Sequence, residues 1–130
     1  MEFEGFLERF NKFRDSVIRG VHIRFRNPAE VSSISVEIST RDRESSETGE
    51  WRNVVLIVED VSEFSFQESS KASYQVISDG LNILQSDDLI YIDFGHFSDP
   101  PDRAVEIRNS PARIIGKHLS WRVEPYREII

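Results

Sequence analysis

WRNVVLIVEDVSEFSF (residues 51–66) begins the stretch that decides the fold, and the stretch continues through YQVISDGLNIL (residues 74–84) to LIYIDFG (residues 89–95). These three apolar segments are rich in β-branched and aromatic residues, which favour strands, and short polar connections separate them. The segment 54–58 is continuously apolar, as expected for a strand covered on both faces. We therefore expect this stretch to form the centre of a β-sheet.

The dipeptide Asp79-Gly80 lies between two segments in which apolar and polar residues alternate. Asp-Gly favours the type I′ turn, whose backbone twist matches two paired antiparallel strands. The sequence therefore predicts a β-hairpin in which Val76 faces Ile83. The face of this hairpin that would be buried carries four apolar side chains: Tyr74, Val76, Leu81 and Ile83.

The flanking sequence extends the β pattern in both directions. Apolar and polar residues alternate in residues 21–26, 33–39 and 118–124, and Val105 and Ile107 indicate another short strand. Because turn residues separate these segments and no helical pattern lies between them, neighbouring strands should pair antiparallel. The expected fold class is mainly β (α+β), with about nine short strands between residues 16 and 124. The strands would form an antiparallel sandwich or a partly open barrel.

Two segments are predicted to be loops. Residues 41–50, RDRESSETGE, contain no apolar side chain, so we expect an exposed and mobile loop there. Residues 95–102, GHFSDPPD, include Pro100-Pro101, which excludes a helix and an inner strand.

The N-terminal segment predicts one amphipathic helix over about residues 2–14. Its apolar residues recur at spacings of three and four, as one stripe of a helix requires. The stripe consists of Phe3, Phe6, Leu7, Phe10 and Phe13. Packing of this stripe on the sheet is the favoured interpretation, because the charges between these residues are mixed, whereas a helix on a membrane surface is typically basic. The whole chain, residues 1–130, is expected to be a single domain.

Composition restricts the compartment and the chemistry. The chain has no cysteine, which excludes disulfides, cysteine-ligated metals and a cysteine nucleophile. The acidic N-terminus lacks the basic and apolar regions of a secretory signal, and no apolar run approaches the roughly 20 residues of a membrane helix. The sequence therefore predicts a cytoplasmic protein.

The net charge of −7 is distributed unevenly. Residues 27–102 contain four Lys/Arg and sixteen Asp/Glu, whereas the segments on either side are slightly basic. An acidic middle segment disfavours nucleic acid and anionic membranes as partners and would suit a basic protein. The alternative is that these carboxylates only keep the surface soluble. Six arginines at outward strand positions could also form a basic strip, which would suit a homo-oligomer formed through edge strands or a charged partner: Arg19, Arg24, Arg26, Arg108, Arg113 and Arg122. The alternative is that these charges only keep edge strands from aggregating.

The best candidate for a chemical site is DFGHFSDPPD, which contains Asp93, His96, Asp99 and Asp102 within ten residues. Three carboxylates and an imidazole can bind a divalent cation. The alternative is a structural loop, because Asp and Pro are common in turns. No catalytic residue and no cofactor is predicted, since the sequence contains no nucleophile elbow, no paired metal-binding histidines and no phosphate-binding loop.

Three segments, WRNVVLIVEDVSEFSFQE, YQVISDGLNI and WRVEPY, resemble small, uncharacterised β-rich bacterial proteins, some of which are immunity proteins of polymorphic toxin systems. The resemblance implies a binding role, but it does not assign a function to any particular residue. We therefore expect a non-enzymatic protein-interaction module, of which an immunity-type inhibitor that covers a basic partner is one example. The alternative hypothesis is a β-barrel that binds a small molecule or divalent metal, conceivably an enzyme, with its site at residues 93–102.

Overall fold

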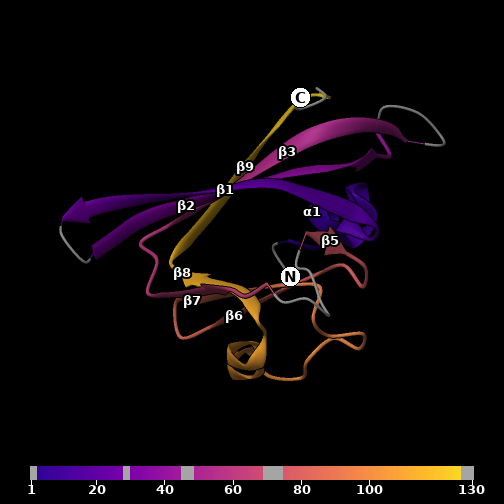
Figure 1. Ribbon diagram of the computed structural model, residues 1–130. Helices are drawn as coiled ribbons and strands as arrows, with labels where there is room; N and C mark the ends of the chain where they lie inside the picture. Colours follow the sequence, from indigo (N-terminus) through magenta and orange to yellow (C-terminus); the bar gives the residue numbers. More distant parts are fainter. Residues whose placement is uncertain (1–2, 28–29, 45–48, 69–74, 127–130) are drawn as a thin grey trace.

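A computed structural model of the protein describes residues 3–27, 30–44, 49–68 and 75–126, which form two antiparallel sheets (Figure 1). The first sheet has the spatial order β5 (Val76–Ile77), β1 (Ser16–Asn27), β2 (Glu30–Asp42), β3 (Glu50–Glu59), β9 (His118–Pro125). The second has the order β4 (Glu63–Phe66), β8 (Ala112–Gly116), β7 (Leu89–Phe94), β6 (Leu81–Ser86). The helical segments are α1 (Glu4–Arg9), η1 (Asn11–Phe13) and η2 (Ala104–Asn109), of which the last two are 3-10 helices. The fold is mainly β, as predicted, and the described strands form two sheets rather than a closed barrel.

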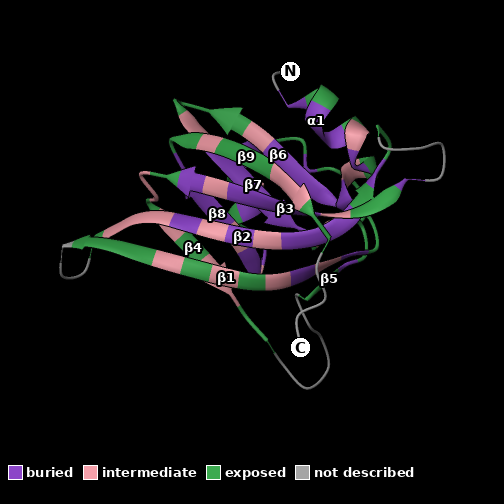
Figure 2. Cartoon of the chain, turned by 90° about the horizontal axis from the view of Figure 1, so that it is seen from above, coloured by how far each residue is buried: buried purple, intermediate pink, exposed green. Residues whose placement is uncertain are grey.

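The core lies between the facing sides of the two sheets. Alternate residues of β2 and β3 point into this layer, as the period-two pattern requires. Eight of the inward side chains are fully shielded from solvent: Ile34, Val36, Ile38, Val54, Leu56, Val58, Ile92 and Ile114. Figure 2 shows this buried zone along the middle of the strands. Removal of this apolar surface from water is the main driving force for packing the sheets.

The N-terminal segment closes one end of the sandwich. All five residues of the predicted stripe are buried, so the expected packing on the sheets is confirmed. The Phe6 ring lies 4.1 Å from the ring of Trp121 in β9. The α-helix ends at Arg9, before the predicted residue 14, because the three residues of η1 have left-handed φ angles of 52°, 56° and 60°.

The predicted hairpin at Asp79-Gly80 is wrong. The turn forms, with φ of +88° at Gly80, but it carries the chain from one sheet to the other. Strand β5 pairs with residues 16–17 of β1, and β6 pairs with β7. Val76 is therefore 49% exposed, whereas Leu81 and Ile83 are buried as expected. Tyr74 lies outside the described residues.

The two-residue hairpin forms instead at Asp87-Asp88, between β6 and β7. Ser86 pairs with Leu89, and the two aspartates have φ angles of 52° and 63°. Positive φ at both central residues is the type I′ geometry, which aspartate tolerates better than most side chains. This turn fixes the register of β6 against β7.

Two further segments differ from the prediction. Val105 and Ile107 lie in η2, which packs on the outer face of the second sheet and forms a small apolar cluster with Tyr91 and Ile115. Strands β2 and β3 extend into the segment 41–50, for which the sequence predicts an exposed loop. A residue of that segment, Asp42, is buried.

The β1–β2 hairpin extends beyond the second sheet (Figure 1). Val21, Ile23 and Phe25 lie on the inner face of β1, as the alternation predicts, but nothing in the described second sheet covers the far end of the hairpin. Val21 and Ile23 are half-buried, and Phe25 is 63% exposed.

Candidate functional site

Asp93, the first residue of the predicted cation site, is completely buried in β7. Its carboxylate accepts a hydrogen bond of 2.6 Å from the Ser110 hydroxyl and one of 2.9 Å from the Asn82 side-chain amide. The backbone N–H of His96 also donates to it, at 3.1 Å. A buried carboxylate requires such donors, and here they tie the loop after β7 to β6 and to the segment before β8. Asp93 therefore has a structural role in this fold.

The other three residues of the predicted site, His96, Asp99 and Asp102, are exposed. The imidazole of His96 lies against the ring of Phe97, with 4.9 Å between the ring centroids. Within the described part of the chain, no group of three or more histidine and acidic side chains is arranged to hold a metal ion. The structure thus separates residues that are close in sequence.

Arginines of the terminal segments neutralise several carboxylates of the acidic middle segment. Arg26 forms an exposed ion pair with Asp60 at 3.0 Å. Arg108 and Arg113 both bind Glu63 on the outer face of the second sheet, at 3.0 and 2.9 Å. Burial opposes the ionisation of Glu63, but the hydrogen bonds from the two guanidiniums outweigh this effect and lower its pKa. The charge asymmetry of the sequence is therefore partly cancelled in the folded protein.

The most buried of these ion pairs joins α1 to the end of β2. The Arg9 guanidinium donates through Nε and Nη2 to the two carboxylate oxygens of Asp42, each at 2.9 Å. The Asp42 side chain is only 4% exposed, and the backbone N–H of Glu44 donates to it as well. The hydrogen bonds from Arg9 lower the pKa of Asp42, and the same bonds raise the pKa of Arg9. This bidentate pair fixes the position of α1.

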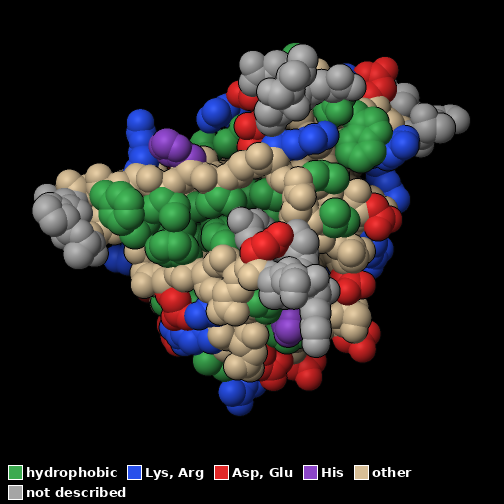
Figure 3. Space-filling model, in the orientation of Figure 1, with side chains coloured by type: hydrophobic (Ala, Val, Ile, Leu, Met, Phe, Trp, Pro, Cys, Tyr) green, Lys and Arg blue, Asp and Glu red, His purple; other side chains and the backbone are tan. Residues whose placement is uncertain are grey.

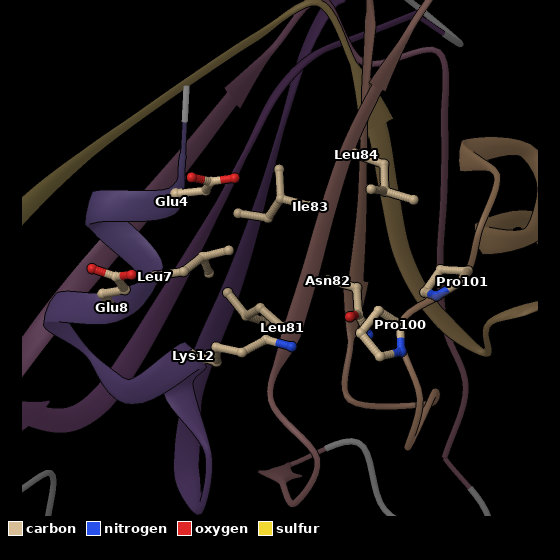
Figure 4. A pocket seen from close by; sticks show the side chains of 10 residues that line it. All are labelled: Glu4, Leu7, Glu8, Lys12, Leu81, Asn82, Ile83, Leu84, Pro100 and Pro101. Atoms are coloured by element: carbon tan, nitrogen blue, oxygen red, sulfur yellow. The ribbon is translucent and has the colours of Figure 1, made fainter. Parts of the chain in front are cut away.

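An apolar cleft of about 270 Å³ opens between α1, β6 and the loop that follows β7. Figure 4 shows Leu7, Leu81 and Ile83 between α1 and β6, and Leu84 and Pro100 on the opposite side of β6. Four consecutive residues of β6 line this cleft, although alternate residues of a strand point to opposite faces. The cleft therefore runs along the edge of β6 rather than across one face.

The edge of β6 that faces the cleft is unpaired in the described structure. Among the described residues, β6 is the last strand of its sheet and pairs with β7 on one side. Leu81, Asn82 and Ile83 are at most 5% exposed, so the outer edge of β6 reaches the surface at residues 84–86. An open strand edge presents backbone N–H and C=O groups that can pair with another chain. The apolar side chains of the cleft therefore adjoin a strand edge that is accessible at residues 84–86.

The rim of the cleft is mainly acidic. Glu4 and Glu8 of α1 line one side together with Lys12, and Figure 4 shows the two carboxylates on the helix. On the other side, the exposed carboxylates of Asp99 and Asp102 flank the two prolines in the chain. Figure 3 shows acidic side chains at the lower right of the molecule, around the loop that follows β7. An acidic rim attracts a positively charged ligand.

Sequence reasoning does not find this cleft, because its lining comes from three segments that are far apart in the chain. Periodicity and turn chemistry assign the residues of its walls to the core or to a turn.

Comparisons with protein-family models, with curated proteins and with solved structures found no match to this chain. The helical segments of the described chain lack the length and the apolar character that a membrane span needs.

Proposed function

We propose that this protein is a non-enzymatic protein-interaction module and that it binds an extended segment of a partner protein at the accessible part of the β6 edge, residues 84–86, beside the apolar cleft. The observation that carries the proposal is the apolar cleft that follows this edge. Strand addition to an open edge is a common mode of peptide recognition, in which the main chain supplies affinity and pockets for alternate side chains supply specificity.

The dimensions of the cleft favour a peptide side chain over a larger ligand. Small-molecule sites typically measure about 300–1,000 Å³, and this cleft is at or below the lower limit. It has room for a few apolar side chains, which is the usual size of an anchor pocket in a protein interface. The occupant is therefore a strand with alternating apolar residues.

The rim determines the charge of the occupant. Glu8 is exposed on α1 beside the cleft, and acidic residues exceed the single lysine, Lys12, on the rim. A partner strand with lysine or arginine between its apolar residues would place positive charges next to these carboxylates. A basic partner, as predicted from the sequence, would complement this rim. The rest of the acidic middle segment contributes less to binding than its net charge suggests, because arginines of the terminal segments neutralise part of it.

An immunity-type inhibitor is one module of this kind, and the sequence resemblance supports it. In that role the cleft would take a strand of a basic toxin and block its active surface. Co-expression with a toxin encoded by the neighbouring gene tests this specific role. The proposed inhibitor should restore growth, and growth arrest in the presence of a well-folded protein would contradict it.

Binding along the edge can be tested on the ¹⁵N-labelled full chain with blocked eight-residue peptides that alternate leucine and lysine. We expect NMR shift changes at the backbone amides of residues 84–86, where the edge of β6 is accessible. A peptide with glutamate in place of lysine should bind more weakly, because the rim is acidic. Methylation of alternate peptide nitrogens should abolish binding, since it removes the donors that pair with the strand edge.

Two matched variants test whether carboxylates on the rim of the cleft attract the lysine peptide. Glu8→Lys should lower the affinity for the lysine peptide by about two- to fivefold, the usual contribution of one exposed ion pair. Glu59→Lys makes the same change at an exposed position of β3, outside the cleft, and should have no effect. The proposal is wrong if the shift changes occur away from β6, or if N-methylation leaves binding intact.

A further inference from the structure

A second cavity lies at the end of the sandwich, on the other side of η1 from the cleft. It measures about 450 Å³ and is enclosed by the segment 10–16 and by the ends of β2 and β3. Its base consists of Ser16 and Thr40, which are each 1% exposed, and the Ser16 hydroxyl donates to Thr40 Oγ1 at 2.6 Å. In contrast to the cleft, this cavity has a polar base that is held in a fixed arrangement.

Three arginines line the cavity, which we call the arginine cavity: Arg14, Arg41 and Arg43. They come from two separate segments and converge only in the folded chain. Asp15 is the one carboxylate among the described lining residues, so cationic side chains are in excess. Figure 3 shows Lys and Arg side chains at the right-hand end of the molecule, beside the ends of β2 and β3.

Weak contacts with uncharged groups position the guanidiniums of Arg41 and Arg43. The Arg41 guanidinium lies 5.2 Å from the centre of the Trp51 ring, and its Nη1 donates to the Gly49 carbonyl at 3.4 Å. Arg43 Nη2 donates to the side-chain oxygen of Asn11 at 3.3 Å. Across residues 3–27, 30–44, 49–68 and 75–126, the structure shows no ion pair between a carboxylate and any of the three arginines. No carboxylate in the described part of the chain therefore neutralises these three charges.

We propose that the arginine cavity binds an oxyanion, which is the phosphate or carboxylate group of a small ligand. Guanidinium groups bind both kinds of anion through paired charge-assisted hydrogen bonds. The chain as a whole carries a net charge of −7 and repels anions, so binding here requires the local excess of arginine. The site is separate from the proposed peptide cleft and does not depend on it.

The fluorescence of Trp51, which lines the cavity, provides the readout. The full chain is titrated with pyrophosphate and with citrate, and potassium chloride keeps the ionic strength constant. We expect a saturable change with at least one of the two anions, and the comparison shows whether phosphate or carboxylate groups are preferred. Trp51→Phe should remove the response, because Trp121 lies elsewhere, against Phe6.

Charge-removing variants test the arginines directly. Arg41→Gln and Arg43→Gln should each weaken binding about tenfold or more, as expected for loss of a charge-assisted hydrogen bond. Arg24→Gln removes the same charge from an exposed position of β1 outside the cavity, and its affinity should equal that of the unmodified protein. All three side chains are exposed, so the variants should fold, and their melting temperatures verify this.

Three results would overturn the proposal. One is a fluorescence response to chloride alone that matches the response to pyrophosphate and citrate. Another is an equal loss of affinity in Arg24→Gln and in the two cavity variants, because it would show that only the overall charge of the protein matters. Absence of any saturable binding by either anion would also contradict it.

Discussion

Loss of the Arg9–Asp42 ion pair should destabilise the protein by detaching α1 from β2. The perturbation is Arg9→Met, which keeps a long apolar side chain and removes the guanidinium. Asp42 then remains as a buried carboxylate that has lost its two hydrogen bonds from the Arg9 guanidinium. A buried charge without its partner is costly, because the protein interior solvates it poorly.

The magnitude follows from the geometry of the pair. Hydrogen bonds to a charged group contribute about 1.5–3 kcal/mol each, and Arg9 makes two with Asp42. The Arg9 side chain is 28% exposed, so water can replace part of the hydrogen bonding that the variant loses. The loss in the free energy of unfolding should therefore be smaller than the sum for two hydrogen bonds. We expect the free energy of unfolding to fall by about 2–3 kcal/mol. Arg26→Met breaks an exposed pair with Asp60 and should cost less than about 1 kcal/mol.

Urea unfolding followed by tryptophan fluorescence measures these changes. Arg9→Met, Asp42→Asn and the double variant form a cycle, in which the double variant should cost less than the sum of the single variants. The lowered pKa of Asp42 adds a pH test: the pair contributes fully above the ordinary carboxyl value of 3.8, and this contribution is lost as the pH falls through the lower folded value. Additive costs in the cycle, or a cost for Arg9→Met that is no larger than that of Arg26→Met, would refute the reasoning.

Two other changes test the packing and the Asp93 site. Gly116→Ala should destabilise the protein by about 1–3 kcal/mol in urea, because a Cβ atom would lie 2.6 Å from Val58 Cγ1, whereas Gly5→Ala in open space should not destabilise it. Ser110→Ala should cost about 1.5–3 kcal/mol because it removes the shortest hydrogen bond to the buried Asp93 carboxylate. Calcium, magnesium and zinc should leave the melting temperature of the unmodified protein unchanged, since Asp93 is already occupied by donors from the chain. A clear rise with any of these ions would support the cation site expected from the sequence.

The candidate sites show where sequence reasoning stops. Asp93, His96, Asp99 and Asp102 are neighbours in the chain, which suggests a common ligand. In the fold, Asp93 points into the interior and the other three lie at the surface. Proximity in sequence keeps the backbones of these residues close together, but it does not determine the directions in which their side chains point. The arginine cavity shows the converse, because Arg14 and Arg41 become neighbours only through the packing of the N-terminal segment on β2.

Local patterns in the sequence determined most of the strands, most of their inward faces and the apolar stripe of the N-terminal segment. These features depend on residues within a few positions of one another, through alternation, helical spacing and turn chemistry. Ile34 and Leu81 illustrate this, because alternation alone assigns both residues to the core.

Only the tertiary structure decided which strands pair and which charges remain uncompensated. Asp79-Gly80 marks a turn correctly. The backbone groups of every strand edge are alike, however, so they do not determine which strand β5 pairs with. The burial of side chains over the whole fold selects that strand. β5 therefore pairs with β1, and β6 is the edge strand of the second sheet among the described residues. The acidic middle segment is likewise neutralised in part by distant arginines, because ion pairs depend on distance in space. Both proposed binding sites arise from this long-range assembly.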